Sequence, residues 1–251
     1  MIHRIATGLL LIAGLWLVIP SARARAADCR QQTPEVFVLT GDIDQALADC
    51  VAARLQPTTR EVILNSRGGS VGPALDIAER FEGRRLTMRV RSECNSSCAN
   101  FFLPLAGRLI VERGAIIGLH GSADPMLIAD ARARGATEEE SQRLTRVADR
   151  QMAFARRNAI PPGWLMYRTE TATAVEGLDG AWGGQTPASR MFIVEERMAR
   201  SCLRGVEIEP YQADLEAGPL RPDRAERLHR GGIARSGTVV CNTVGWEAAP
   251  P

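Results

Sequence analysis

Residues 61–81 have the sequence EVILNSRGGSVGPALDIAERF, and this stretch decides the fold. Its apolar run at 62–64 predicts a short buried strand. The glycine pair Gly68-Gly69 predicts a tight turn after that strand. The apolar residues that follow are spaced for one face of a helix, namely Ala74, Leu75, Ile77, Ala78 and Phe81. The stretch therefore predicts a strand, a turn and a helix, with backbone amides presented at the turn.

The same order of elements returns further along the chain, after about the length of one crossover between parallel strands. Residues 86–90 predict a second strand, 93–97 a small polar turn and 98–105 an apolar helix. A third strand is predicted at 115–119 and is followed by His120. Repeated strand, helix, strand order favours parallel pairing. Two serines and a histidine therefore follow the ends of neighbouring strands, where open α/β folds place their sites.

Four motifs in this order resemble a known family. They are LTGDID at 39–44, NSRGGSV at 65–71, SSCANFFL at 96–103 and the histidine at 120. Together they resemble the Clp protease proteolytic subunit within the ClpP/crotonase superfamily. More narrowly, they resemble secreted ClpP-like proteins of Gram-negative bacteria that have a Cys-x-Ser-x-Cys nucleophile turn. The resemblance covers roughly 36–124 and implies an α/β fold of repeated ββα units with a mostly parallel sheet.

The resemblance also implies a catalytic site. A serine hydrolase needs a serine at a helix N-terminus, a base within hydrogen-bond reach of it, and amides directed at the developing oxyanion. Matched to the family motifs, Ser97 is the nucleophile and His120 the base. The oxyanion hole is formed by the Gly68, Gly69 and Cys98 amides.

A second register at the nucleophile stays open. When Cys94 and Cys98 are aligned with the Cys-x-Ser-x-Cys pattern, the nucleophile is Ser96 instead of Ser97. Both serines could also simply cap the following helix, since Ser is a favoured N-cap residue.

The third member of a catalytic triad is not fixed by the sequence. In the family it follows a helix downstream of the histidine, and here that helix is predicted at 137–158, opened by a capping box of Thr137 and Glu140. Glu170 and Asp179 are candidates beyond it, a Ser-His dyad is equally allowed, and both acids could be exposed loop residues.

The first 26 residues are expected to be a signal peptide. Arg4 gives a positive start, 5–19 are apolar, and Ala24-Arg25-Ala26 has the small-x-small pattern of a cleavage site. Cleavage near Ala26 would export the chain to the periplasm or beyond. An uncleaved anchor is the rival interpretation, although the apolar run is shorter than the ~20 residues of a spanning helix.

The rest of the chain is expected to be a ClpP/crotonase-like domain at 27–200 and a C-terminal extension at 201–251. At the start of the domain we expect a loop at 30–34, a strand at 35–40 and a helix at 42–55. Late in the extension a strand is predicted at 237–241.

The six cysteines all follow the predicted signal peptide, and an even count in an exported chain favours disulfides. Proximity suggests three pairs among the fifteen possible connectivities, namely Cys29–Cys50, Cys94–Cys98 and Cys202–Cys241. A bridge from Cys94 to Cys98 would span the nucleophile turn, and could hold it productive or lock it inactive. The spacing gives no usual zinc ligand set, so no metal is expected.

The net charge and the motifs of the chain exclude some classes of function. The net charge of +2 is too small to indicate nucleic-acid binding. No phosphate-binding glycine motif is present, and no cofactor is expected. The resemblance implies a serine peptidase that acts on a peptide or protein and, by family analogy, forms a homo-oligomer. The alternatives are an inactive scaffold that binds a peptide or protein partner, and a crotonase-type enzyme for acyl thioesters, which export disfavours.

Overall fold

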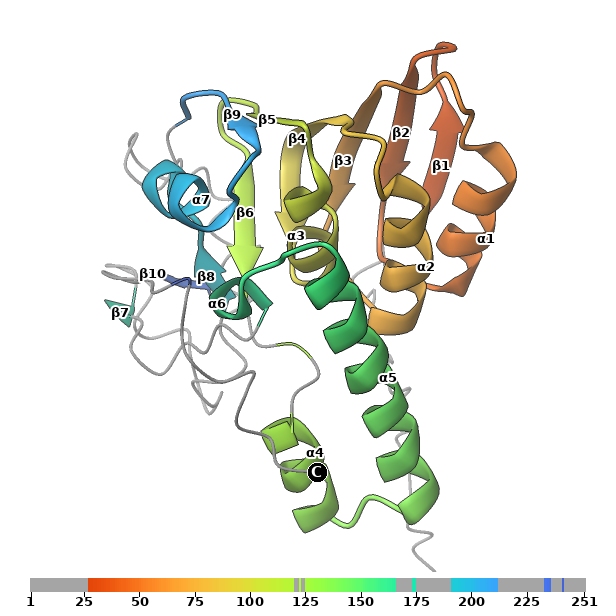
Figure 1. Ribbon diagram of the computed structural model, residues 1–251, viewed down its shortest axis with the longest axis vertical. Coiled ribbons are helices and arrows are strands. Elements are labelled where there is room, and N and C mark those ends of the chain that lie inside the picture. The colour runs from red at the N-terminus through yellow and green to blue at the C-terminus, as the bar shows by residue number, and fades with distance from the viewer. Residues whose placement is uncertain are drawn as a thin grey trace, which may run out of the picture.

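The computed structural model describes residues 27–119, 122, 125–165, 173–174, 191–211, 233–235 and 241 (Figure 1). The predicted signal peptide, His120, Glu170, Asp179 and most of the strand expected at 237–241 lie outside these residues.

The described strands form one mixed sheet. In chain order they are β1 (Asp28–Gln31), β2 (Val36–Thr40), β3 (Glu61–Ser66), β4 (Thr87–Asn95), β5 (Arg108–Val111), β6 (Ile116–Leu119), β7 (Thr173–Ala174), β8 (Met191–Ile193), β9 (Glu207–Ile208) and β10 (Ile233–Arg235). Pairing is parallel throughout β2-β3-β4-β5-β9, between β4 and β6, and between β8 and β10. It is antiparallel for β1-β2, β6-β8 and β7-β10.

The described helices connect these strands. They are α1 (Gln45–Arg54), α2 (Val71–Phe81), α3 (Ser97–Phe101), the 3-10 helix η1 (Leu103–Leu105), α4 (Pro125–Ala133), α5 (Glu138–Arg157), α6 (Pro162–Leu165) and α7 (Glu196–Cys202). In Figure 1, α1 and α2 lie beside the strands they connect, and α5 runs past the end of α2 toward α4. The chain therefore has the α/β fold with a mostly parallel sheet that the sequence predicts.

The two halves of strand β4 pair with different strands, and this change of partner positions the site. Its first residues, 87–90, pair with β5, whereas 93–95 pair with β6. The expected polar turn at 93–97 is therefore wrong for its first half, because Asn95 still pairs with Gly118 of β6. The turn is confined to Ser96, directly before α3.

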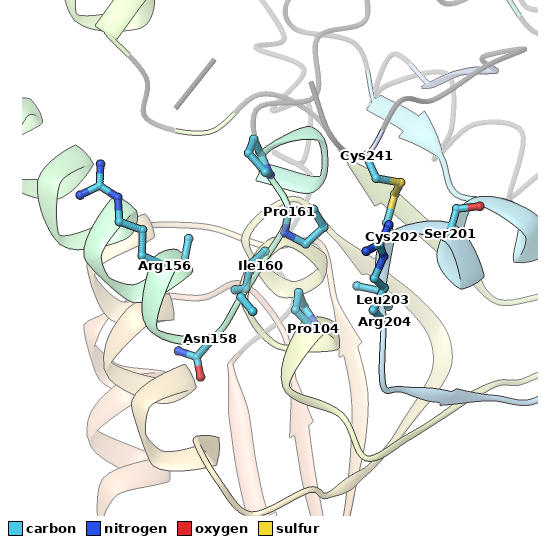
Figure 2. Close-up of a pocket in the computed structure, with 13 residues that line it drawn as sticks. Pro104, Arg156, Asn158, Ile160, Pro161, Ser201, Cys202, Leu203, Arg204 and Cys241 are labelled. Carbon is cyan, nitrogen blue, oxygen red and sulfur yellow. A yellow bond between two sulfur atoms is a disulfide. The ribbon is translucent and has the colours of Figure 1, made fainter. Parts of the chain in front are cut away.

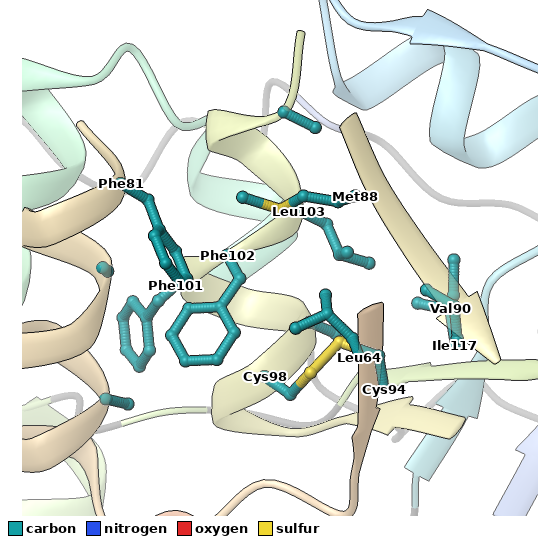
Figure 3. Packing of buried hydrophobic residues seen from close by; sticks show 14 of the residues in the cluster. Leu64, Phe81, Met88, Val90, Cys94, Cys98, Phe101, Phe102, Leu103 and Ile117 are labelled. Atoms are coloured by element: carbon teal, nitrogen blue, oxygen red, sulfur yellow. A yellow bond between two sulfur atoms is a disulfide. The ribbon is translucent and has the colours of Figure 1, made fainter. Parts of the chain in front are cut away.

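The core lies between the sheet and helices α2 and α3 (Figure 3). Leu64 of β3 is fully buried there, and Phe81 and Phe102 meet edge to face with ring centroids 5.5 Å apart. The Cys94–Cys98 bridge packs in the same cluster. Burial of apolar side chains is the main favourable contribution to the free energy of folding. The turn between β4 and α3 is therefore held in place by the core, in which both of its cysteines are buried.

Local differences from the sequence prediction have identifiable causes. The helix expected at 42–55 begins at Gln45, because the Asp44 side chain caps it by accepting from the Leu47 amide at 2.8 Å. The expected helix at 98–105 is split into α3 and η1, since Pro104 cannot donate a helical hydrogen bond. Part of the expected loop at 30–34 is strand β1, paired with β2.

The three disulfides are Cys29–Cys50, Cys94–Cys98 and Cys202–Cys241, which confirms the pairing expected from proximity. The expected domain boundary at residue 200 falls inside α7, and β9 beyond it pairs with β5 in the main sheet. None of the helices in the described part of the chain is long and apolar enough to span a bilayer.

Candidate active site

The glycine turn lies between two other loops and fits there only because it has no side chains. Gly68 has φ +90°, and a Cβ on it would lie 2.5 Å from the Asn95 carbonyl oxygen and 2.6 Å from the Ser96 Cβ. A Cβ on Gly69 would lie 2.2 Å from the Ile43 carbonyl oxygen. The Ile43 amide donates to the Gly68 carbonyl at 2.8 Å, which fixes the turn against the loop before α1.

Ser96 occupies a strained backbone conformation at the turn from β4 into α3. Its φ of 53° and ψ of −129° are unusual for a residue other than glycine and cost of order 1–3 kcal/mol. Its amide donates to the Gly118 carbonyl at 2.7 Å, and its carbonyl accepts from the Asn100 amide at 2.8 Å. A serine on a sharp strand-to-helix turn is the arrangement that exposes a nucleophilic hydroxyl in many hydrolases.

Ser97 is placed differently from its neighbour. It is only 5% exposed, and its hydroxyl donates to the Gly69 carbonyl oxygen at 2.8 Å. This bond connects the α3 turn to the glycine turn. Ser96, by contrast, is partly exposed. The two candidate serines therefore have distinct environments, which the sequence alone did not distinguish.

Both serines line a pocket of about 580 Å³, a volume within the ordinary range for ligand sites. Its walls come from the start of α2, the α3 turn and the face of α5. The lining residues are Gln45, Gly69, Ser70, Val71, Gly72, Pro73, Ser96, Ser97, Asn100, Ser122, Arg143, Leu144 and Val147.

The amides near the pocket differ in what they contact. The Gly68 amide donates to the Ser66 hydroxyl at 3.1 Å, and that hydroxyl donates to the Gly41 carbonyl at 2.6 Å. Among the described residues the Gly69 amide has no hydrogen-bond acceptor, and Gly69 itself lines the pocket. The Ser97 amide, in the first turn of α3, has no intrahelical acceptor.

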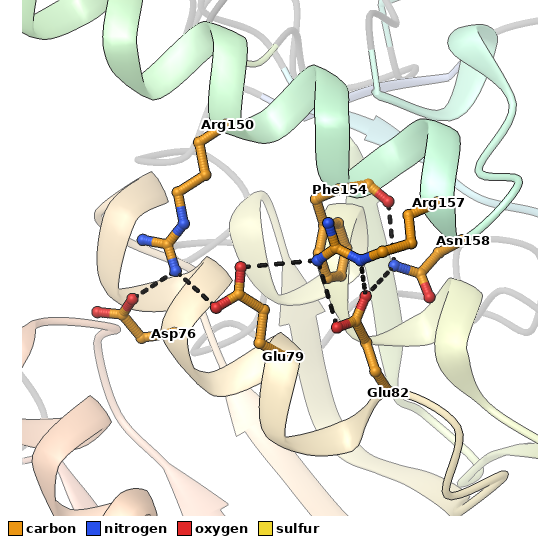
Figure 4. A network of polar contacts seen from close by, with 7 residues as sticks. All are labelled: Asp76, Glu79, Glu82, Arg150, Phe154, Arg157 and Asn158. Atoms are coloured by element: carbon orange, nitrogen blue, oxygen red, sulfur yellow. Dashed lines mark hydrogen bonds and ion pairs between the residues drawn. The ribbon is translucent and has the colours of Figure 1, made fainter.

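The α5 wall of the pocket is held against α2 by ion pairs (Figure 4). Arg150 contacts Asp76 at 2.6 Å and Glu79 at 2.8 Å. Arg157 binds Glu82 at 2.9 Å and lies over the Phe154 ring. We call these α2–α5 contacts the clasp.

The charge of Glu82 follows from the clasp. Partial burial by itself raises the pKa of the Glu82 carboxyl, but hydrogen bonds from Arg157 and Asn158 outweigh it, so the pKa lies below its ordinary value. Glu82 is therefore held ionised between two donors.

Buried polar contacts fix the inner end of the pocket. The hydroxyl of Ser122 donates to Oε1 of Gln151, which is fully buried on α5. Asn100 is 1% exposed, and its side chain donates to the Leu165 carbonyl at 3.3 Å. Its Oδ1 has no hydrogen-bond partner among the described residues. Sequence reasoning missed Gln151, Asn100 and Arg143, although the 143, 144 and 147 spacing is typical of one helix face.

A larger pocket of about 930 Å³ lies at the other end of α5 (Figure 2). Pro104, Ile160 and the Cys202–Cys241 bridge line it, together with Arg156 and Arg204. Arg156 belongs to the last turn of α5, and Arg204 follows α7. Cations at helix C-termini complement the helix dipole. This pocket contains neither the glycine turn nor the strained serine, so we place the candidate site at the smaller one.

Comparison with known proteins gives distant similarities. No family model and no curated protein sequence matches the chain. It is similar to a ClpP1 variant from Listeria monocytogenes, at 15% identity and TM-score 0.42, over 73% of this chain and 95% of that one. It is also similar to a variant of the 1510-N membrane-bound stomatin-specific protease, at 17% identity and TM-score 0.29, over 38% and 57%.

A third similar structure is methylmalonyl CoA decarboxylase complexed with 2S-carboxypropyl CoA, at 11% identity and TM-score 0.31, over 48% of this chain and 60% of that one.

Proposed function

We propose that this chain is a ClpP-like serine hydrolase of the periplasm that cleaves peptide bonds in a peptide or protein substrate. The observation that carries the proposal is the conformation of Ser96. It combines a strained strand-to-helix turn with a place on the wall of a substrate-sized pocket. Strain of this kind persists where surrounding structure over-determines it, and such positions cluster at active sites.

The geometry favours Ser96 over Ser97 as the nucleophile. The Ser97 hydroxyl already donates to the Gly69 carbonyl and is almost fully buried. An attack by Ser97 would require that bond to break and the side chain to turn toward the pocket. Ser96 is partly exposed and lines the pocket, and the Cys-x-Ser-x-Cys register assigns it the same role.

In the proposed reaction, Ser96 Oγ attacks the carbonyl carbon of the scissile bond while His120 accepts the hydroxyl proton. The resulting oxyanion accepts hydrogen bonds from the Ser97 and Gly69 amides. The tetrahedral intermediate collapses, the C–N bond breaks, and His120 returns the proton to the leaving amine. Water then hydrolyses the acyl-enzyme by the same steps, with His120 as the base. Glu170 and Asp179 remain candidates for a third member.

The disulfides support the proposed compartment. Three disulfides are typical of proteins in an oxidising environment. Together with the signal peptide predicted at 1–26, they support export to the periplasm. Self-association is proposed by family analogy alone.

The test is labelling of the purified mature protein with a fluorophosphonate, followed by mass spectrometry of the modified peptide. We expect the label on Ser96, its loss in Ser96→Ala and His120→Ala, and its retention in Ser97→Ala. A label that stays in Ser96→Ala and disappears in Ser97→Ala would restore the other register.

The second candidate function is an inactive scaffold that binds a peptide or protein in the same pocket. It is favoured by the Gly68 amide, which already donates to the Ser66 hydroxyl and so is not free to stabilise an oxyanion. Absence of labelling on both serines, in protein whose disulfides are intact, would support the scaffold and reject the hydrolase.

A further inference from the structure

We propose that Arg143 makes the pocket selective for substrates that carry a carboxylate close to the scissile bond. This inference rests on the proposed function, because it assigns the substrate class of the same site. It goes beyond the family resemblance, which gives no role to any residue of α5.

The first argument is the charge of the pocket. Among the described residues that line it, only Arg143 is charged, and the others are apolar or neutral polar. Arg143 makes no ion pair within the described part of the chain. A guanidinium with several free donors is well suited to a carboxylate, which it can bind through two parallel hydrogen bonds.

One acid within a turn of Arg143 on the same helix is already engaged. Glu140, one turn before Arg143, accepts from the Thr137 amide at 2.8 Å and from the Thr137 hydroxyl at 3.1 Å. This capping box holds the Glu140 carboxylate at the start of α5. Hydrogen bonds from Thr137, and to a smaller extent the charge of Arg143, lower the pKa of this carboxyl. The Arg143 side chain lines the pocket and makes no hydrogen bond to Glu140 among the described residues.

A second element contributes positive potential to the same cavity. The N-terminus of α2 opens onto the pocket, because Ser70, Val71 and Gly72 all line it. The amides of Val71 and Gly72 have no intrahelical acceptor, and a helix N-terminus favours an anion. Arg143 and the start of α2 come from separate parts of the chain, yet they favour the same ligand charge.

The remaining walls strengthen this preference. Val71 and Pro73 on one side and Leu144 and Val147 on the other are apolar. Arg143 is exposed, so solvent screens part of its charge, and the apolar walls limit that screening on the side of the pocket. They also suit the aliphatic part of an acidic side chain. The substrate class is thus a peptide with either an acidic side chain or a free C-terminal carboxylate at the site.

The first experimental arm uses two peptidyl phosphonates that differ only in carrying Glu or Gln beside the phosphorus. We expect the Glu probe to label Ser96 about tenfold faster, the scale of one charge-assisted hydrogen bond. In Arg143→Gln the ratio should fall to about one, and Arg143→Lys should keep part of it. Arg146→Gln is the matched control, since Arg146 is exposed on the same helix and does not line the pocket.

The second arm distinguishes the two sources of the carboxylate. A tetrapeptide with a free C-terminus and its C-terminal amide are compared as competitors of a small uncharged fluorophosphonate. Stronger competition by the acid identifies a C-terminal carboxylate, and preference confined to the Glu phosphonate identifies a side chain.

The outcomes separate this inference from the proposed function. Labelling of Ser96 by the uncharged probe, with equal rates for all matched acid and amide pairs, overturns the role of Arg143 and leaves the hydrolase intact. A preference that survives in Arg143→Gln also overturns it. No labelling by any probe rejects the hydrolase itself, and the inference with it.

Discussion

Gly68 and Ser96 face each other so closely that a Cβ on Gly68 would lie 2.6 Å from the Ser96 Cβ. The two residues belong to different crossovers, one after β3 and one after β4. The glycine turn therefore packs directly against the strained serine, and a substitution in either loop should change the conformation of the other.

The first prediction concerns this contact. Gly68→Ala is expected to abolish labelling of Ser96 and to lower the free energy of unfolding by about 3 kcal/mol, from left-handed strain plus overpacking. Labelling kinetics and urea denaturation measure the two effects. Gly135→Ala is the matched control, because Gly135 has a similar φ of +89° but a Cβ there would contact nothing within 4 Å. Equal effects of both substitutions on labelling would contradict the contact.

The second prediction concerns the Cys94–Cys98 bridge, which closes a loop with Ser96 at its centre. For so short a loop, the chain-entropy model gives only about 2 kcal/mol of stabilisation. We expect the double variant Cys94→Ala/Cys98→Ala to lose most labelling of Ser96 nonetheless, because the turn can then relax.

The control for the bridge is Cys29→Ala/Cys50→Ala, which removes a loop of sequence separation 21. It is expected to cost more stability, about 3 kcal/mol, yet to leave labelling intact. Thermal unfolding and labelling rates are compared side by side. If the loss of Ser96 labelling is instead larger in the double variant that loses more stability, the Cys94–Cys98 bridge has no specific role at the site.

Sequence patterns predicted those parts of the fold whose cause is local. The run at 62–64, the pair Gly68-Gly69 and the helical spacing up to Phe81 each reflect a nearby constraint, and all appear as β3, the turn and α2. Strands β5 and β9 were not predicted, because each is short and depends on partners far away in the sequence: β5 pairs with β4, and β9 pairs with β5, as between Arg108 and Glu207.

The site was only partly predictable for the same reason. The Ser96 and Ser97 pair has no local feature that tells which backbone is strained. That is decided by the pairing of Asn95 with Gly118 and by the contact with Gly68. The place of Arg143 at the pocket was not predictable, since only the approach of α5 to the start of α2 brings this exposed side chain to a pocket.

The third prediction concerns the fully buried Gln151, whose Oε1 accepts from the part-buried Ser122 hydroxyl. Ser122 lines the pocket and follows His120 by two positions in the sequence. Gln151→Leu leaves the part-buried Ser122 hydroxyl without this acceptor and should cost about 1 kcal/mol, with slower labelling of Ser96. Gln142→Leu, at an exposed position of the same helix, should change neither measurement. A Gln151→Leu protein with wild-type labelling would show that this contact does not organise the site.

The fourth prediction concerns the clasp and pH. The pKa of Glu82 is below its ordinary value of 4.5 in the folded chain, because the donors Arg157 and Asn158 outweigh the effect of burial. Its contribution to stability is therefore complete above pH 4.5 and is lost as the pH falls through the lowered folded pKa.

Glu82→Gln should accordingly destabilise the protein at pH 7, and the difference from wild type should shrink at pH values below the folded pKa. Urea denaturation at a series of pH values measures this convergence. Glu139→Gln, at an exposed position of α5, should show no comparable pH dependence. Since the clasp holds the helix that carries Arg143 and Leu144, Glu82→Gln should also weaken the carboxylate preference at pH 7. A constant difference in unfolding free energy across the whole pH series would mean that Glu82 does not carry the clasp.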